Sequence, residues 1–166
     1  MISIRRLGFA KWRRPETDAA AIVPEIYRYV FARINHVEQA EDIAMEVLHI
    51  ASSSPPPNDL KEYMIGIARR KVADHFRQNA RVQNLGDTDE RFVTENSDEF
   101  IRIQMVLGRL AENYQECLVL KYVCGFSSEE ISTMLSTTST AIDNTLQRAR
   151  KAFAEEWNLL NGDEDE

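Results

Sequence analysis

Apolar residues recur through most of the chain at intervals of three and four, the spacing of one face of an α-helix, and no convincing alternating strand pattern is present. In the first half this pattern predicts helices over residues 19–34, 40–51 and 60–83, with Pro24 limiting the first to a start near that residue. The expected buried stripes are Ala40, Ile43, Val47 and Ile50 in the second helix, and Ile65, Ala68, Val72 and Phe76 in the third. The pattern therefore predicts an all-α fold.

The second half of the chain is also predicted to be helical, but its helices are arranged differently. Helices are expected over residues 100–110 and 113–124, and Gly125 supplies a C-terminal cap. Ser127 with Glu130 three residues later is the sequence of a capping box, which begins a short helix over residues 128–135. A polar turn then leads to a longer helix whose inner stripe is Ile142, Leu146, Ala149, Phe153 and Trp157. A short helix, a tight turn and a longer helix form a helix-turn-helix pattern.

Composition divides the chain into two small helical domains, residues 19–83 and 99–160. The stretch between them, residues 84–98, is acidic, polar and nearly aperiodic, and is predicted to be a linker. Residues 1–18 form a basic N-terminal arm that either contacts a binding partner or serves as a flexible solubilising segment. Residues 161–166 are an acidic tail.

The net charge of −7 argues against a nucleic-acid partner, but its distribution is more informative. Residues 63–83 hold five basic residues against one acidic residue, so a basic block interrupts an acidic chain. Cys117 and Cys124 share a helical face with no metal-ligand spacing, which favours buried reduced thiols. No apolar run approaches the roughly 20 residues that span a bilayer, and no secretory signal is evident, so a cytoplasmic protein is expected.

Three ordered segments resemble a known family. The stretch "LAENYQECLVLKYVCGFSSEEISTMLSTTSTAIDNTLQRARKAF" resembles the promoter −35-binding module of bacterial sigma factors. Upstream, "AEDIAMEVLHIA" is similar to their helix that binds core polymerase, and "EYMIGIARRKVADHFRQNAR" to the helix that engages the −10 element. The order and spacing resemble the extracytoplasmic-function (ECF) group of the sigma-70 family, over about residues 20–157.

The resemblance implies a dissociable initiation subunit that binds core RNA polymerase, recognises promoter DNA and helps to open it. It also implies an inhibitory partner, an anti-sigma factor. The polymerase performs all catalysis in such a complex, so no enzyme activity, cofactor, metal or membrane insertion is expected for this chain.

The resemblance assigns core-polymerase binding to an outer helical face, which on its own is equally a solvated charged surface. Acidic groups there would steer association with a basic partner. The sequence departs from the family pattern at Gln39, where an acidic residue is common, and at Met45, where a glutamine is common. The residues of this face are Glu41, Asp42, Met45, Glu46 and His49.

The basic block is the candidate contact with the −10 region, although it could equally be an amphipathic helix with arginines in water. Cations that neutralise phosphates give salt-sensitive DNA binding. In the family a −10 base is extruded near the preceding loop, where Asn58, Asp59 and Tyr63 either contact that base or serve turn chemistry and core packing. The basic residues are Arg69, Arg70, Lys71, Arg77 and Arg81.

The last long helix is the candidate contact with the −35 region. Asn and Gln side chains can bond adenine, and arginine can anchor phosphate or contact guanine. The family often has basic residues where Asp143 and Thr145 stand, so weaker or altered −35 binding is expected. Asp143 also lies in the first turns of the helix, where the helix dipole favours a negative charge. Its carboxylate could accept a hydrogen bond from cytosine N4. The candidate residues are Thr140, Asp143, Asn144, Gln147, Arg148 and Lys151.

Two other classes of function compete with a sigma factor. The first is a sigma mimic that sequesters an anti-sigma factor without productive DNA binding, which Asp143, Thr145 and the overall acidity favour. The second is a stand-alone helix-turn-helix repressor, which leaves the first three helices without a role. An enzyme is disfavoured because the histidines and cysteines form no ligand spacing and no phosphate-binding glycine loop is present.

Overall fold

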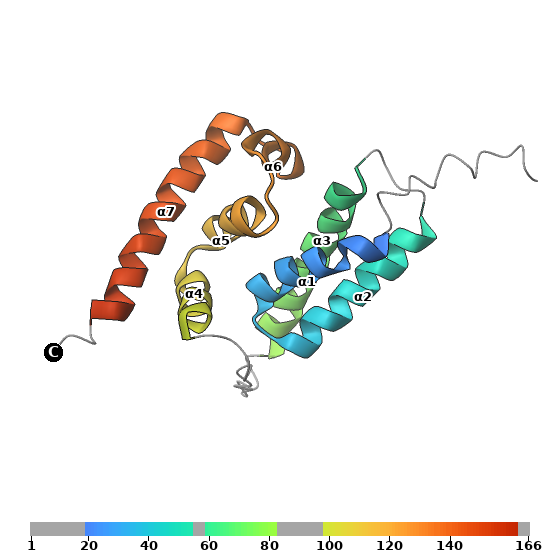
Figure 1. Cartoon of the computed structure of the whole chain (residues 1–166), viewed down its shortest axis with the longest axis horizontal. Helices are drawn as coiled ribbons and strands as arrows, with labels where there is room; N and C mark the ends of the chain where they lie inside the picture. Colours follow the sequence, from blue (N-terminus) through green and yellow to red (C-terminus); the bar gives the residue numbers. More distant parts are fainter. Residues whose placement is uncertain (1–18, 55–58, 83–97, 163–166) are drawn as a thin grey trace, which may run out of the picture.

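The structure, a computed structural model, describes residues 19–54, 59–82 and 98–162. Its described residues contain helices and no strands, which confirms the predicted all-α fold (Figure 1). The helices are α1 (Ala19–Ile34), α2 (Val37–Ser53), α3 (Leu60–Val82), α4 (Asp98–Arg109), α5 (Glu112–Leu118), α6 (Ser128–Met134) and α7 (Ser139–Gly162), with a short π-helical segment, η4 (Val119–Val123), continuing α5.

Helices α1, α2 and α3 pack together and form what we call the N-terminal lobe (Figure 1). The buried side of α2 consists of Ala40, Ala44, Val47 and Ala51. The predicted stripe is therefore wrong at Ile43 and Ile50, which are only half-buried. Alanines at three of these four positions allow the neighbouring helices to approach closely, which favours this side of α2 over the side with the larger isoleucines.

Two further expectations for the N-terminal lobe are wrong. Helix α1 does not start near Pro24, because that residue lies inside the helix. Pro24 is the sixth residue of α1, so its missing N–H removes one hydrogen bond to the preceding turn, and α1 continues through it in this structure. Phe76 does not belong to the buried stripe of α3, since it is 39% exposed. Val72 is the last buried residue of α3 among the side chains that the structure describes, and residues 73–79 are half-buried or exposed.

Helices α4 to α7 form the C-terminal lobe (Figure 1). The capping box is confirmed: the Ser127 hydroxyl accepts from the Glu130 amide at 3.2 Å, and the Glu130 carboxylate accepts from the Ser127 amide at 2.7 Å. The turn before α6 contains Gly125 with a φ of 75°. This left-handed conformation suits glycine and ends the preceding helix.

The long helix α7 packs through Ile142, Leu146 and Ala149, which are buried as predicted. Phe153 and Trp157 extend this stripe as half-buried residues, with their rings stacked 6.0 Å apart. The outward face of α7 lies on the side of the helix opposite this stripe, so it stays exposed when the stripe packs against the lobe.

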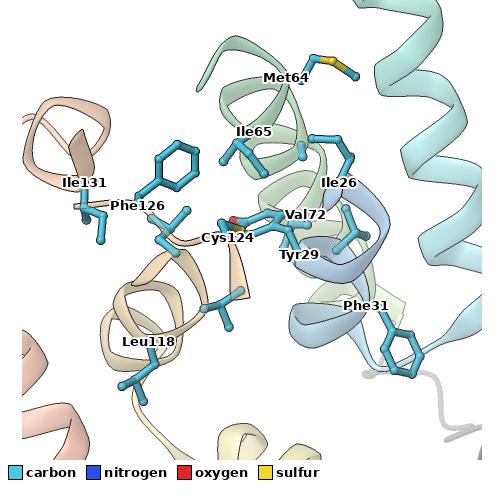
Figure 2. Packing of buried hydrophobic residues seen from close by; sticks show 14 of the residues in the cluster. Ile26, Tyr29, Phe31, Met64, Ile65, Val72, Leu118, Cys124, Phe126 and Ile131 are labelled. Carbon is cyan, nitrogen blue, oxygen red and sulfur yellow. The ribbon is translucent and has the colours of Figure 1, made fainter. Parts of the chain in front are cut away.

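The two lobes share one apolar cluster. Cys124 and Phe126 of the C-terminal lobe lie beside Tyr29, Ile65 and other residues of the N-terminal lobe (Figure 2). We call the contact surface between the lobes the seam. The Phe31 and Phe100 rings stack across it with their centroids 5.8 Å apart. In the part of the chain that the structure describes, no helix has the length and apolar character needed to cross a membrane.

The residues expected to form the N-terminal arm and nearly all of the linker lie outside the described ranges. Helix α4 includes Asp98, the last residue of the expected linker, and α7 extends through the first two residues of the expected tail. The division into two domains stays a prediction.

Candidate nucleic-acid and polymerase interfaces

The outward side of α7 carries polar residues with free access to solvent. We call this set the α7 face, and its members are all exposed. Amide side chains and cations lie together on it, which is the chemistry that contacts base edges and phosphates. The members are Thr140, Asn144, Gln147, Arg148 and Lys151.

Asp143 lies at the edge of the α7 face and has a structural partner. Its carboxylate accepts a hydrogen bond from the Ser128 hydroxyl, with an oxygen–oxygen distance of 2.6 Å. Ser128 is the first residue of α6, so this bond ties the two helices of the helix-turn-helix together. Thr145 is also engaged, since its hydroxyl donates to the Ala141 carbonyl at 2.8 Å.

The outer face of α2 is exposed at each of the five expected positions, Glu41, Asp42, Met45, Glu46 and His49. Met45 is 57% exposed, so an apolar group stands among acidic ones. Glu46 forms an ion pair with Lys71 of α3. A residue expected to contact polymerase is therefore paired with one expected to contact DNA, and part of the charge on each is neutralised.

The basic block of α3 is only partly open to solvent. Arg70 and Arg77 are exposed, and Arg77 forms an ion pair with Asp74 at 3.0 Å. Arg69 instead faces the C-terminal lobe and is half-buried. The side chain of Arg81 lies outside what the structure describes. Burial, and secondarily His36, lower the pKa of His75, so this histidine adds no positive charge to the block at neutral pH.

The loop before α3 provides one helix cap. The Asp59 carboxylate accepts from the Glu62 amide at 2.9 Å, which is the turn chemistry that its position suggested. Tyr63 is half-buried and lines a hollow together with Arg69, Arg70 and Met134. Asn58 lies outside the described residues.

Polar contacts across the seam between the lobes join Arg69 to residues that sequence reasoning did not select. Glu116 accepts from Arg69 at 2.5 Å and from the Tyr29 hydroxyl at 3.3 Å. Arg69 also donates to the Met134 carbonyl at 2.9 Å. Burial, reinforced by Glu116, raises the pKa of Tyr29, so its hydroxyl remains a neutral donor. In this conformation, these hydrogen bonds of Arg69 are thus made with the C-terminal lobe.

Lys61 also contacts the C-terminal lobe. Its ammonium group donates to the Cys124 carbonyl at 2.7 Å across the seam, and it pairs with Glu25 of its own lobe at 2.6 Å. It also lies 4.9 Å from the centre of the Phe126 ring, within the range of a cation–π contact. No sequence signal marks Lys61, because its partners are distant in the chain.

Arg33 has the least favourable surroundings of the seam residues. Its side chain is only 3% exposed, and its Nε has no hydrogen-bond partner among the described residues. The two contacts of its terminal nitrogens with Glu112 are both long, at 3.5 Å. A sequence signal did exist, since Arg33 falls on the same helical face as the buried Ile26 and Tyr29.

Both cysteines are free and buried, as predicted. Burial raises the pKa of Cys117, and raises that of Cys124 to about 12. Among the described residues no group of three or more His, Cys, Asp or Glu side chains has an arrangement that could hold a metal ion.

Comparison with known proteins agrees with this architecture. Residues 100–153 match the family model described as Sigma-70, region 4. The chain is 29% identical over 154 residues to the ECF RNA polymerase sigma factor SigD of Mycobacterium tuberculosis, an alignment covering 81% of this chain and 73% of SigD. It is 26% identical over 144 residues to the ECF sigma factor BldN of Streptomyces coelicolor, covering 78% of this chain. The chain spans only about half, 54%, of the length of BldN.

The fold also matches a solved sigma factor. The sigma factor RpoE of Bartonella quintana, crystallised with the anti-sigma factor NepR, superposes with a TM-score of 0.66 at 20% identity. The match covers 82% of this chain and 92% of RpoE. The fold of this chain is thus the all-α fold of that structure, with a helix-turn-helix in its C-terminal lobe. More particularly, residues 100–153 match Sigma-70 region 4, and the chain is similar to sigma factors of the ECF group.

Proposed function

We propose that this chain is an initiation subunit that binds core RNA polymerase, recognises the −10 and −35 elements of a promoter and promotes strand opening. The observation that carries the proposal is the exposed α7 face, where Asn144, Gln147 and Arg148 stand opposite a buried apolar stripe. These groups are free to enter a major groove, where amide and guanidinium groups distinguish bases.

The N-terminal lobe supports the same proposal through two surfaces. The outer face of α2 offers acidic groups and the exposed Met45 to a basic partner, which favours association with core polymerase. Arg70 and Arg77 on α3 are accessible to phosphates of the −10 region. Arg69 reaches DNA only when it releases Glu116, so full engagement of the −10 region requires the two lobes to move apart.

A run-off transcription assay with purified core polymerase tests the proposal. Core polymerase with the wild-type chain bound should yield a run-off product from a cognate promoter, which is identified by its binding to that complex. The double variant Asn144→Ala/Gln147→Ala should lose at least tenfold in promoter-specific product, because each bidentate base contact contributes about 1–3 kcal/mol. The matched control is Asn158→Ala, an exposed asparagine farther along α7 and outside the α7 face.

Failure to bind core polymerase would overturn the proposal. The sigma-mimic alternative predicts that failure together with tight binding of an anti-sigma factor, the type of partner that NepR is for the Bartonella protein. Co-purification with core polymerase would exclude the mimic. Asp143 no longer favours the mimic specifically, because its carboxylate has a structural role at Ser128.

A further inference from the structure

A hollow of about 430 Å³ opens at the seam between the lobes, lined by α1, α3 and residues of α5. We call it the seam pocket. Four arginines line it, Arg33, Arg69, Arg70 and Arg77, against two carboxylates, Glu112 and Glu116. The lining therefore has a surplus of two positive charges at neutral pH. A concave site of this volume is within the range of small-molecule pockets.

The buried positive charge of Arg33 is incompletely compensated by its neighbours, which favours binding of an anion in the seam pocket. A buried guanidinium needs paired, well-formed hydrogen bonds, because removing its charge from water is costly. Among the described residues, Arg33 has no partner for its Nε and makes only long contacts with Glu112, whose own side chain is 75% exposed. That carboxylate is mostly solvated and compensates the buried charge poorly.

The other cations of the seam pocket differ in availability. Arg69 is already committed to Glu116 and the Met134 carbonyl. Arg70 makes no hydrogen bond or ion pair with any residue that the structure describes, and Arg77 has only the exposed Asp74 beside it. The charge of Glu116 is compensated by Arg69, and Tyr29 also donates a hydrogen bond to it, so Glu116 offers little repulsion to an incoming anion. Arg33, Arg70 and Arg77 are left to bind one.

We propose that the seam pocket binds a compact phosphorylated small molecule, whose phosphate oxygens accept from Arg33 and Arg70. Guanidinium groups bind phosphate through paired, charge-assisted hydrogen bonds, and several converging arginines suit a polyanion such as a diphosphate. Because both lobes line the pocket, the bound ligand stabilises their association. It thereby opposes the release of Arg69 from Glu116.

Isothermal titration of the full chain with inorganic pyrophosphate, at constant ionic strength, tests this proposal without polymerase or promoter. We expect one saturable site, with an affinity at least about tenfold weaker in Arg70→Gln because a charge-assisted bond is lost. Arg77→Gln provides a second pocket variant. The matched control is Arg28→Gln, an exposed arginine of α1 that does not line the pocket and whose substitution should leave the affinity unchanged.

Absence of saturable binding, or equal affinity in the wild type, Arg70→Gln and Arg77→Gln, would overturn the proposal. A short single-stranded DNA provides a further arm. If that DNA binds through Arg70 and pyrophosphate does not bind, the arginines serve a nucleic-acid strand and the small-molecule site is ruled out. Either result is independent of whether the chain supports transcription.

Discussion

Ser128 donates its hydroxyl hydrogen to the Asp143 carboxylate at 2.6 Å, and this bond joins the first turn of α6 to α7. The aspartate that looks misplaced on a DNA-contacting helix therefore has a partner within the protein. Its negative charge remains near the α7 face, but its orientation is fixed by α6. Positioning of the helix-turn-helix and DNA affinity can be tested separately at this residue.

Removing either partner of this bond should destabilise the C-terminal lobe modestly. Ser128→Ala and Asp143→Ala should each lower the free energy of unfolding by about 0.5–1.5 kcal/mol, the typical net value of one hydrogen bond. The double variant should cost less than the sum, because the second substitution removes a bond already lost. Urea denaturation of the four proteins measures the coupling, and strictly additive effects would contradict the assigned bond.

The charge of Asp143 should weaken DNA binding even though its position is structural. Asp143→Asn keeps an oxygen that accepts from Ser128 and removes the repulsion of phosphate. Duplex affinity should rise about twofold to fivefold at low salt, as expected for one charge acting through solvent, and the gain should shrink as salt is added. Fluorescence anisotropy over a salt series measures this effect, and weaker binding of the variant would indicate a direct favourable contact by the carboxylate.

Glu116 should hold the lobes together. Glu116→Gln weakens its bonds to Arg69 and Tyr29, so the free energy of unfolding should fall by about 1–3 kcal/mol, and the radius of gyration should rise as open conformations become populated. Denaturation and small-angle X-ray scattering measure these changes. Glu155→Gln is the control, because Glu155 lies in an exposed pair 3.9 Å from Lys151 and should have little effect. An unchanged radius together with unchanged stability would argue against this role.

Burial of the α7 stripe can be tested with two identical substitutions on the same helix. Leu146 is 2% exposed and Leu159 is 66% exposed. Leu146→Ala should lower the free energy of unfolding by about 2–5 kcal/mol through lost packing and a residual cavity, whereas Leu159→Ala should cost less than about 0.5 kcal/mol. Thermal and chemical denaturation measure the difference, and comparable losses would mean that α7 packs through another face.

Stability should decrease under alkaline conditions because of Cys124. Burial raises its pKa from the ordinary thiol value of 9.0 to about 12 in the folded chain, so the unfolded chain releases the proton first. The folded state binds more protons between these two values, and the stabilisation present below pH 9 is lost as pH rises toward 12. Denaturation from pH 7 to 10 should show this decline, and Cys124→Ala should flatten it. An equal slope in the variant would assign the effect to other groups, such as Tyr29, whose pKa is also raised.

The sequence alone determined the helices, the capping box at Ser127 and the exposure of the α7 face, because helical periodicity and caps depend on neighbours within a few residues. It also indicated the free, buried state of both cysteines. The prediction of the buried side was wrong where two sides of a helix are both apolar, as with Ile43 and Ala44 on α2. Only the shape of the neighbouring helices determines which of the two sides is buried.

Only the tertiary structure decided which polar groups meet across the seam. Arg69 and Glu116 are 47 positions apart, and the buried Arg33 meets Glu112 across 79 positions. No local pattern in the sequence encodes such pairs, because they exist only once the apolar cluster has brought the two lobes together. The commitment of Arg69 to the C-terminal lobe and the arginine-lined seam pocket are therefore properties of the packed chain and not of any one helix.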